Sequence, residues 1–195
     1  MTFREAGFVA AASPPILLAR HNFETRRIRD LLGDSRFDRS LEIGCGFGRL
    51  SLEFAEHSVT HVAIDINVAA LDLARSTYPE IDFRHASVLA LPFADETFDL
   101  VSTWTVLQHI RPEFIQQATT EVARVMAPSG TLLMCEETRL AHEPVTSDAH
   151  TWHRATDAYT ALFPSLQLLA DAFIEEIDRM PGMVSPGRVM LFRRH

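Results

Sequence analysis

Three glycines at alternate positions, Gly44, Gly46 and Gly48, follow a short apolar run and precede an amphipathic segment. Glycine has no Cβ atom, so a sharp strand-to-helix turn built from it brings backbone N–H groups close to a ligand. A second apolar run, 62–64, ends in Asp65, a carboxylate at the position where parallel-sheet nucleotide sites hold a ribose diol. Together the two features predict a site for a nucleoside cofactor.

The spacing of the glycines bears on which cofactor this is. Dinucleotide sites usually follow the pattern GxGxxG, in which the third glycine lets the helix pack closely on the strand. Here the third glycine comes one residue early, and Arg49 occupies the position of the dinucleotide motif's last glycine. The spacing therefore favours a cofactor other than a dinucleotide.

Four sequence blocks carry a resemblance to a known family. They are LEIGCGFGRL at 41–50, VAIDIN at 62–67, FRHASVLALPFADETFDLV at 83–101 and EVARVMAPSGTLLMCEE at 121–137. In order and spacing they resemble the class I S-adenosylmethionine-dependent methyltransferases of the small-molecule type, with a minimal Rossmann-like domain. The resemblance covers roughly residues 20–138. It implies S-adenosylmethionine as cofactor and S-adenosylhomocysteine as product.

The resemblance assigns cofactor contacts to the first two blocks. It implies that the backbone of the three glycines lies against the methionine part of the cofactor and that Glu42 helps to hold its amino group. Asp65 would accept hydrogen bonds from both ribose hydroxyls, and Ile66 would flank the adenine. The alternatives are a turn or helix-capping carboxylate for Glu42 and a solvated strand-end aspartate for Asp65.

The third block departs from the family at one position. The family usually has an aspartate after the third strand to bind the adenine amino group, and this chain has Ser87. We expect the Ser87 hydroxyl and the Val88 backbone to bind adenine, with some loss of affinity. By the same resemblance, Thr103 and Trp104 lie over the methionine. Trp104 would shield the sulfonium by a cation–π contact or serve as a buried packing residue.

His109 is the candidate general base, because histidine changes charge near neutral pH and this segment faces the acceptor in the family. The alternative is a structural histidine at a helix start. Four residues are predicted to contact the substrate: Glu137, His150, His153 and Tyr159.

A helix over 148–160 would place His150, His153 and Asp157 on one face, which could bind a divalent metal or simply face solvent and substrate. The strand-end aspartates of metal-dependent methyltransferases are not evident, so no metal site is predicted.

Hydrophobic periodicity predicts the elements that position these residues. Helices are expected at 16–32, 49–56, 68–76, 112–126 and 151–163, and strands at 40–43, 62–65, 81–85, 98–102 and 131–136. The resemblance adds an antiparallel pair at 166–176 and 188–193. The prediction is an α/β, Rossmann-like, doubly wound and mostly parallel seven-stranded sheet with an antiparallel closing strand and helices on both faces. Residues 1–195 would form one domain, with an N-terminal helical segment at 1–35 and a substrate-side cap at 139–165.

Composition limits the function classes. The chain has 195 residues and a net charge of −8, and all 18 basic residues are arginines. The acidic charge argues against a general nucleic-acid binder, and the lack of lysine excludes a Schiff-base mechanism. No signal peptide and no apolar stretch near ~18 residues is evident, so we expect no membrane contact. Two cysteines without a pairing pattern suit the cytoplasm. The sequence leaves the oligomeric state open.

The expected function is methyl transfer from S-adenosylmethionine to an oxygen or nitrogen of a small molecule. Two other classes stay open at this point. One is a catalytically inactive S-adenosylmethionine-binding partner protein, which the serine at the adenine position favours. The other is a nicotinamide-dependent oxidoreductase, which the glycine spacing disfavours.

Overall fold

One mixed sheet organises the chain. The computed structural model describes residues 14–138, 151–152, 154–173 and 187–195. The strands are β1 (Phe37–Ile43), β2 (Ser58–Asp65), β3 (Asp82–His85), β4 (Phe98–Trp104), β5 (Met126–Glu137), β6 (Leu166–Phe173) and β7 (Gly187–Arg194). The helices are α1 (Pro14–Leu32), α2 (Ser51–Glu56), α3 (Val68–Thr77), the short 3-10 helix η1 (Leu107–His109), α4 (Pro112–Val125) and α5 (Thr156–Ala161).

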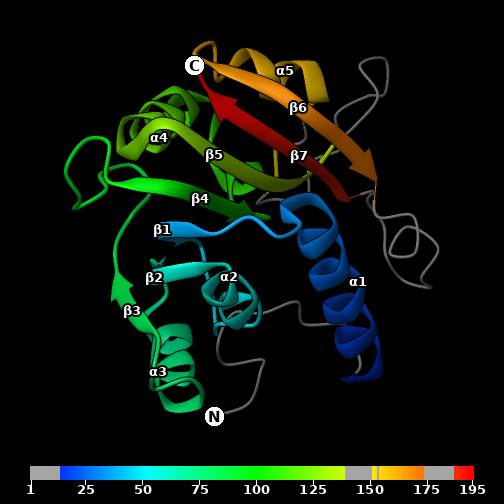
Figure 1. Cartoon of the computed structure of the whole chain (residues 1–195), viewed down its shortest axis with the longest axis vertical. Coiled ribbons are helices and arrows are strands. Elements are labelled where there is room, and N and C mark those ends of the chain that lie inside the picture. The colour runs from blue at the N-terminus through cyan, green and yellow to red at the C-terminus, as the bar shows by residue number, and fades with distance from the viewer. Residues whose placement is uncertain (1–13, 139–150, 153, 174–186) are drawn as a thin grey trace.

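The strand order is β3-β2-β1-β4-β5-β7-β6 in a sheet of seven strands. The strands from β3 to β5 pair in parallel, whereas β7 is antiparallel to both of its neighbours. Figure 1 shows the β7 arrow pointing against the arrows of β4 and β6. The predicted fold class, with its antiparallel closing strand, is confirmed.

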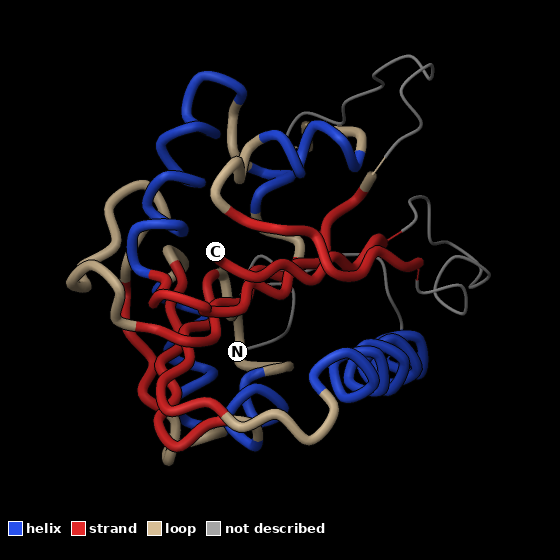
Figure 2. The backbone as a smooth tube through the Cα atoms, turned by 45° about the horizontal axis from the view of Figure 1, so that its top comes forward, coloured by secondary structure: helices blue, strands red, loops and turns tan. Residues whose placement is uncertain are grey.

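Helices lie on both faces of the sheet (Figure 2). On one face α4 and α5 bury apolar side chains such as Val122 and Tyr159 in the larger core cluster. On the other face α1 and α2 pack around Phe54, and α3 contributes Leu71 to an adjacent cluster. Among the helices described, none is both long and apolar enough to span a membrane.

Two expectations about local structure were wrong. The helix predicted at 151–163 forms only over Thr156–Ala161. Before it, the Trp152 N–H donates to the Gln108 carbonyl at 2.7 Å, Arg154 forms a β-bridge with Thr138, and Ala155 is extended with ψ 160°, so tertiary contacts hold these residues in a non-helical conformation. The strand expected at 131–136 is longer, because β5 runs over Met126–Glu137 with an irregularity at Ser129, where φ is 60°.

Candidate functional site

The turn after β1 has the conformation that its glycines predict. Gly44, Gly46 and Gly48 have φ values of 75°, 55° and 82°, a region that other residues rarely adopt. A Cβ atom on Gly44 would lie 2.3 Å from Cγ2 of Val106, and one on Gly48 would lie 2.9 Å from Cζ of Phe83. The turn is therefore packed too closely against its surroundings for a side chain at either position.

Asp65 ends β2 beside this turn. One carboxylate oxygen accepts the Gly46 N–H at 2.7 Å, and the other accepts the Asn67 N–H at 2.7 Å. The side chain stays partly exposed, and the next residue, Ile66, is an apolar side chain that is 69% exposed. Each carboxylate oxygen can accept a further hydrogen bond. Asp65 could therefore accept hydrogen bonds from a ribose, and Ile66 could contact an adenine, at this end of the strands.

Glu42 is buried at the end of β1. Its Oε2 accepts a hydrogen bond from the Ser51 hydroxyl at the start of α2 and lies 3.6 Å from Nε2 of His61. The other ring nitrogen of His61 is 2.8 Å from the Ser40 hydroxyl oxygen. These partners fix the carboxylate behind the glycine turn. These partners were not predicted from the sequence, although aligning the apolar runs 41–43 and 62–64 in parallel pairs Ser40 with His61.

Ser87 follows β3 and is half-buried, while Val88 is 7% exposed and joins the larger core cluster. The Ser87 hydroxyl accepts the Leu89 N–H at 3.2 Å, and the Ser87 carbonyl accepts the Ala90 N–H at 3.1 Å. The side chain thus stabilises its own turn. An aspartate makes the same type of turn and has a second oxygen to offer to a ligand.

Replacing Ser87 with aspartate should therefore tighten binding of S-adenosylhomocysteine by at most ~1 kcal/mol, about fivefold in Kd, without loss of Tm. Isothermal titration calorimetry and thermal unfolding measure the two quantities. Ser87→Ala is the matched control, because it removes the turn acceptor and adds no carboxylate. A large loss of affinity in Ser87→Asp would show that the adenine group lies elsewhere.

The end of β4 is buried. Thr103 is 0% exposed and its hydroxyl donates to Glu136 at 3.3 Å. The Trp104 indole is 5% exposed and packs with Ile28 of α1 and with Leu50. The structure thus places Trp104 in the packing position, and contact of either residue with the cofactor stays a prediction.

A buried ion cluster joins α1 to the residue after the glycine turn. The Glu24 side chain is 1% exposed and pairs with Arg20 at 2.8 Å and with Arg49. Burial acts to raise the pKa of Glu24, but attraction to Arg49 and Arg20, with a contribution from Trp104, outweighs it and holds the pKa below its usual value. Arg49, singled out for its position in the motif, therefore anchors the N-terminal helix.

The acceptor-side residues differ in accessibility. His109 ends η1 with an exposed side chain, and Glu137, at the end of β5, is partly exposed. Tyr159 is 0% exposed in the core, with the Arg154 guanidinium carbon 5.9 Å from its ring centroid. Burial raises its pKa and favours packing over substrate contact. His150 and His153 lie outside the described residues.

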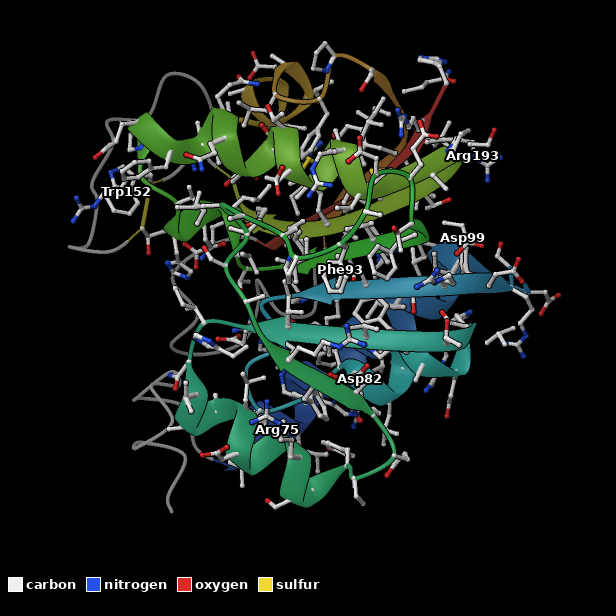
Figure 3. The ribbon with its side chains drawn as sticks, turned by 90° about the vertical axis from the view of Figure 1, so that its left-hand side faces the viewer. Arg75, Asp82, Phe93, Asp99, Trp152 and Arg193 are labelled. Atoms are coloured by element: carbon white, nitrogen blue, oxygen red, sulfur yellow. The ribbon has the colours of Figure 1, made fainter. Side chains whose placement is uncertain are left out.

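The glycine turn, Asp65 and Trp104 stand at the carboxyl ends of β1, β2 and β4, which pair in parallel and therefore end on the same side of the sheet. Figure 3 shows Asp99, near the start of β4, at one end of the strands and Trp152 at the other, where the parallel strands end. Ligands of open α/β sheets bind beyond the carboxyl ends of the strands. Within the part of the chain that the structure describes, no group of three or more His, Cys, Asp or Glu side chains is arranged to hold a metal ion.

A Rossmann-like sheet with a glycine turn and a strand-end aspartate defines a nucleoside-cofactor protein, and sequence comparison gives the family. Residues 41–130 match the family described as a methyltransferase domain. The chain is 32% identical over 117 residues to a demethylmenaquinone methyltransferase of Renibacterium salmoninarum, covering 58% of this chain and 48% of that protein. It is 31% identical over 142 residues to a malonyl-[acyl-carrier protein] O-methyltransferase of Enterobacter lignolyticus, covering 71% and 54%.

Solved structures agree on the fold. The N-methyltransferase NodS of Bradyrhizobium japonicum, in complex with S-adenosylhomocysteine, superposes with a TM-score of 0.70 at 22% identity, covering 92% of this chain and 88% of that one. YcgJ of Bacillus subtilis gives 0.73 at 15% identity, covering 90% and 99%. Taken together, the methyltransferase-domain match at residues 41–130 and these relatives support a class I S-adenosylmethionine-dependent methyltransferase. The chain spans about half the length of the curated relatives that it matches.

Proposed function

We propose that this protein transfers a methyl group from S-adenosylmethionine to an oxygen or nitrogen of a small molecule. The observation that carries the proposal is the close approach of Asp65 to the glycine turn, 2.7 Å from the Gly46 nitrogen, next to the exposed apolar side chain of Ile66. A diol acceptor and an exposed apolar side chain thus lie directly beside the glycine turn, whose N–H groups at Gly44 and Gly46 are held by Ile64 and Asp65. S-adenosylmethionine supplies an electrophilic methyl group when it is bound.

The chain's own part in the reaction is positioning. Holding the nucleophile about 3 Å from the methyl carbon and in line with the departing sulfur provides most of the acceleration. An oxygen nucleophile also needs a base, and the exposed His109 is our candidate. Glu137, His150 and His153 are proposed to contact the acceptor.

Two observations support a small-molecule oxygen or nitrogen as the methyl acceptor. Curated relatives include an O-methyltransferase, and a structural neighbour is an N-methyltransferase. The net charge of −8 disfavours a nucleic-acid acceptor. We also propose that residues 1–195 act as one domain with a substrate-side cap at 139–165. We further propose a cytoplasmic location, which the buried free thiols of Cys45 and Cys135 support.

One observation favours a second candidate, a catalytically inactive S-adenosylmethionine-binding partner. Ser87 stands at the adenine position, and its hydroxyl already accepts a hydrogen bond within its own turn. Calorimetric titrations with S-adenosylhomocysteine and with NAD(P) test the cofactor. An untargeted metabolite screen for a mass gain of one methyl group tests turnover. Binding of S-adenosylhomocysteine without any methylated product would favour the inactive partner, and binding of NAD(P) alone would overturn both candidates.

His109→Asn tests the proposed base. The side chain is exposed, so its loss should leave Tm and S-adenosylhomocysteine affinity nearly unchanged. Turnover of an oxygen acceptor should fall ~10²–10⁴-fold, the usual contribution of a positioned base. Tm, Kd and kcat are measured on one preparation. Unchanged kcat would rule out the base, whereas joint loss of all three would make His109 structural and direct the search to Glu137, His150 and His153.

A further inference from the structure

The segment that joins β4 to α4, residues 105–110, is held by a buried carboxylate. Glu136 is 0% exposed at the end of β5. Its Oε1 accepts the N–H groups of Val106 at 3.3 Å and Leu107 at 3.0 Å, and its Oε2 accepts that of Gln108 at 3.0 Å. One side chain therefore satisfies the successive donors at the start of η1.

Arg154 holds the same segment by donating hydrogen bonds to its backbone carbonyl groups. Its Nη1 donates to the Leu107 carbonyl at 2.9 Å, and its Nη2 donates to the Ile110 carbonyl at 2.8 Å. The backbone of Trp152 adds a hydrogen bond to the Gln108 carbonyl. The carboxylate and the guanidinium thus fix both the N–H and the C=O groups of one short turn.

This segment touches the cofactor turn at one end and carries the candidate base at the other. The Val106 side chain occupies the space that a Cβ atom on Gly44 would need. Thr105, one residue earlier, has φ 57°, a conformation costly for a threonine unless its surroundings impose it. His109 follows within the same turn. Small shifts of this segment would move both the wall of the cofactor site and the base.

We propose that Glu136 and Arg154 are positioning residues of the methyl-transfer site, which set the path of residues 105–110 between the cofactor turn and the acceptor. The proposal rests on the proposed function. Neither residue needs to touch cofactor or acceptor, since both act through the backbone between them.

The cost of burying Glu136 supports a positioning role. Burial raises the pKa of Glu136 to about 7, although the N–H groups of Gln108, Leu107 and Val106 and the Thr103 hydroxyl act to lower it. A buried carboxylate is unfavourable unless its oxygens are satisfied, and apolar side chains of similar size often stabilise a core as well or better. Here three of the four donors, the N–H groups of residues 106–108, belong to the segment that Glu136 fixes.

The test compares two arginines that each bridge two loop carbonyls. Arg124 donates to the carbonyls of Phe93 at 2.8 Å and Leu91 at 3.0 Å, in the loop that leads to the start of β4, and Arg124→Met is the control for Arg154→Met. Glu136→Gln keeps the side-chain volume but replaces one acceptor oxygen with an NH₂ donor. Arg154→Lys is the conservative variant. The readouts are amide exchange at residues 106–108 by NMR, S-adenosylhomocysteine affinity by calorimetry, and Tm.

We expect Arg154→Met and Glu136→Gln to speed exchange at residues 106–108 at least tenfold and to weaken S-adenosylhomocysteine binding three- to tenfold. Arg154→Lys should recover most of the affinity, and Arg124→Met should change both readouts by less than twofold whatever its Tm. If Arg154→Met lowers Tm but leaves exchange and affinity as in Arg124→Met, the proposal is wrong. If wild type binds no S-adenosylhomocysteine, the proposed function fails, and the exchange data still report whether the two residues hold the segment.

Discussion

Asp65→Ala should weaken binding of S-adenosylhomocysteine by ~2–4 kcal/mol, about 30- to 1000-fold in Kd. In the proposed site the carboxylate accepts hydrogen bonds from two ribose hydroxyls, and hydrogen bonds to an ionised acceptor are stronger than those between neutral groups. It also accepts the Gly46 N–H at 2.7 Å and the Asn67 N–H at 2.7 Å, so alanine removes the support of the glycine turn as well. Isothermal titration calorimetry measures the affinity.

Two variants separate the ribose contact from support of the turn. Asp65→Asn keeps one acceptor oxygen without the charge, and we expect an intermediate affinity. Asp72→Ala removes an exposed aspartate of α3 that pairs with Arg75 at 3.1 Å, and it should bind as wild type does. An Asp65→Ala protein with wild-type Tm and wild-type affinity would show that the ribose is not bound at Asp65.

The sequence predicts the fold and the glycine turn because both depend on local information. Alternation of apolar strands with amphipathic helices fixes the order of the elements, and a positive φ at Gly44 requires no distant partner. The helix near the end of the chain was harder to predict from the sequence. Residues 151–155 have a helical pattern, but the Gln108 carbonyl, which is remote in sequence, takes the N–H of Trp152.

The residues missed at the site depend on contacts across the fold. Arg154 donates to carbonyls of residues 107 and 110, whose positions are set only when β4 has paired with β5. No local pattern distinguishes Glu136, a buried carboxylate that accepts three successive N–H groups, from a solvated acid at the end of a strand. Tyr159, predicted to contact the substrate, has a side chain that the fold buries, which no local pattern indicates, and its contact with the substrate stays a prediction.

Glu24→Ala should have the largest effect on stability. It leaves the guanidinium groups of Arg20 and Arg49, which are 18% and 16% exposed, without the carboxylate that neutralises them between α1 and the glycine turn. Removing one partner of a buried pair typically costs ~3–5 kcal/mol, and we expect about 3 kcal/mol because both arginines reach solvent. For a chain of this size that corresponds to a fall in Tm on the order of 10 °C.

Charge, rather than lost packing, is the reason for this loss, and two comparisons isolate it. Asp72→Ala breaks a helical pair whose members are 44% and 60% exposed, and exposed pairs contribute about 1 kcal/mol or less. Glu24→Gln keeps the shape of the side chain and removes its charge.

Because the pKa of Glu24 is held below 4.5, its ion pairs stabilise the fold fully above that pH and lose their contribution as the carboxylate is protonated in acid. The difference in unfolding free energy between wild type and Glu24→Gln should therefore be full at pH 7 and shrink as the pH falls below 4.5. A difference that does not change with pH would mean that shape and hydrogen bonding, not charge, hold α1 against Arg49.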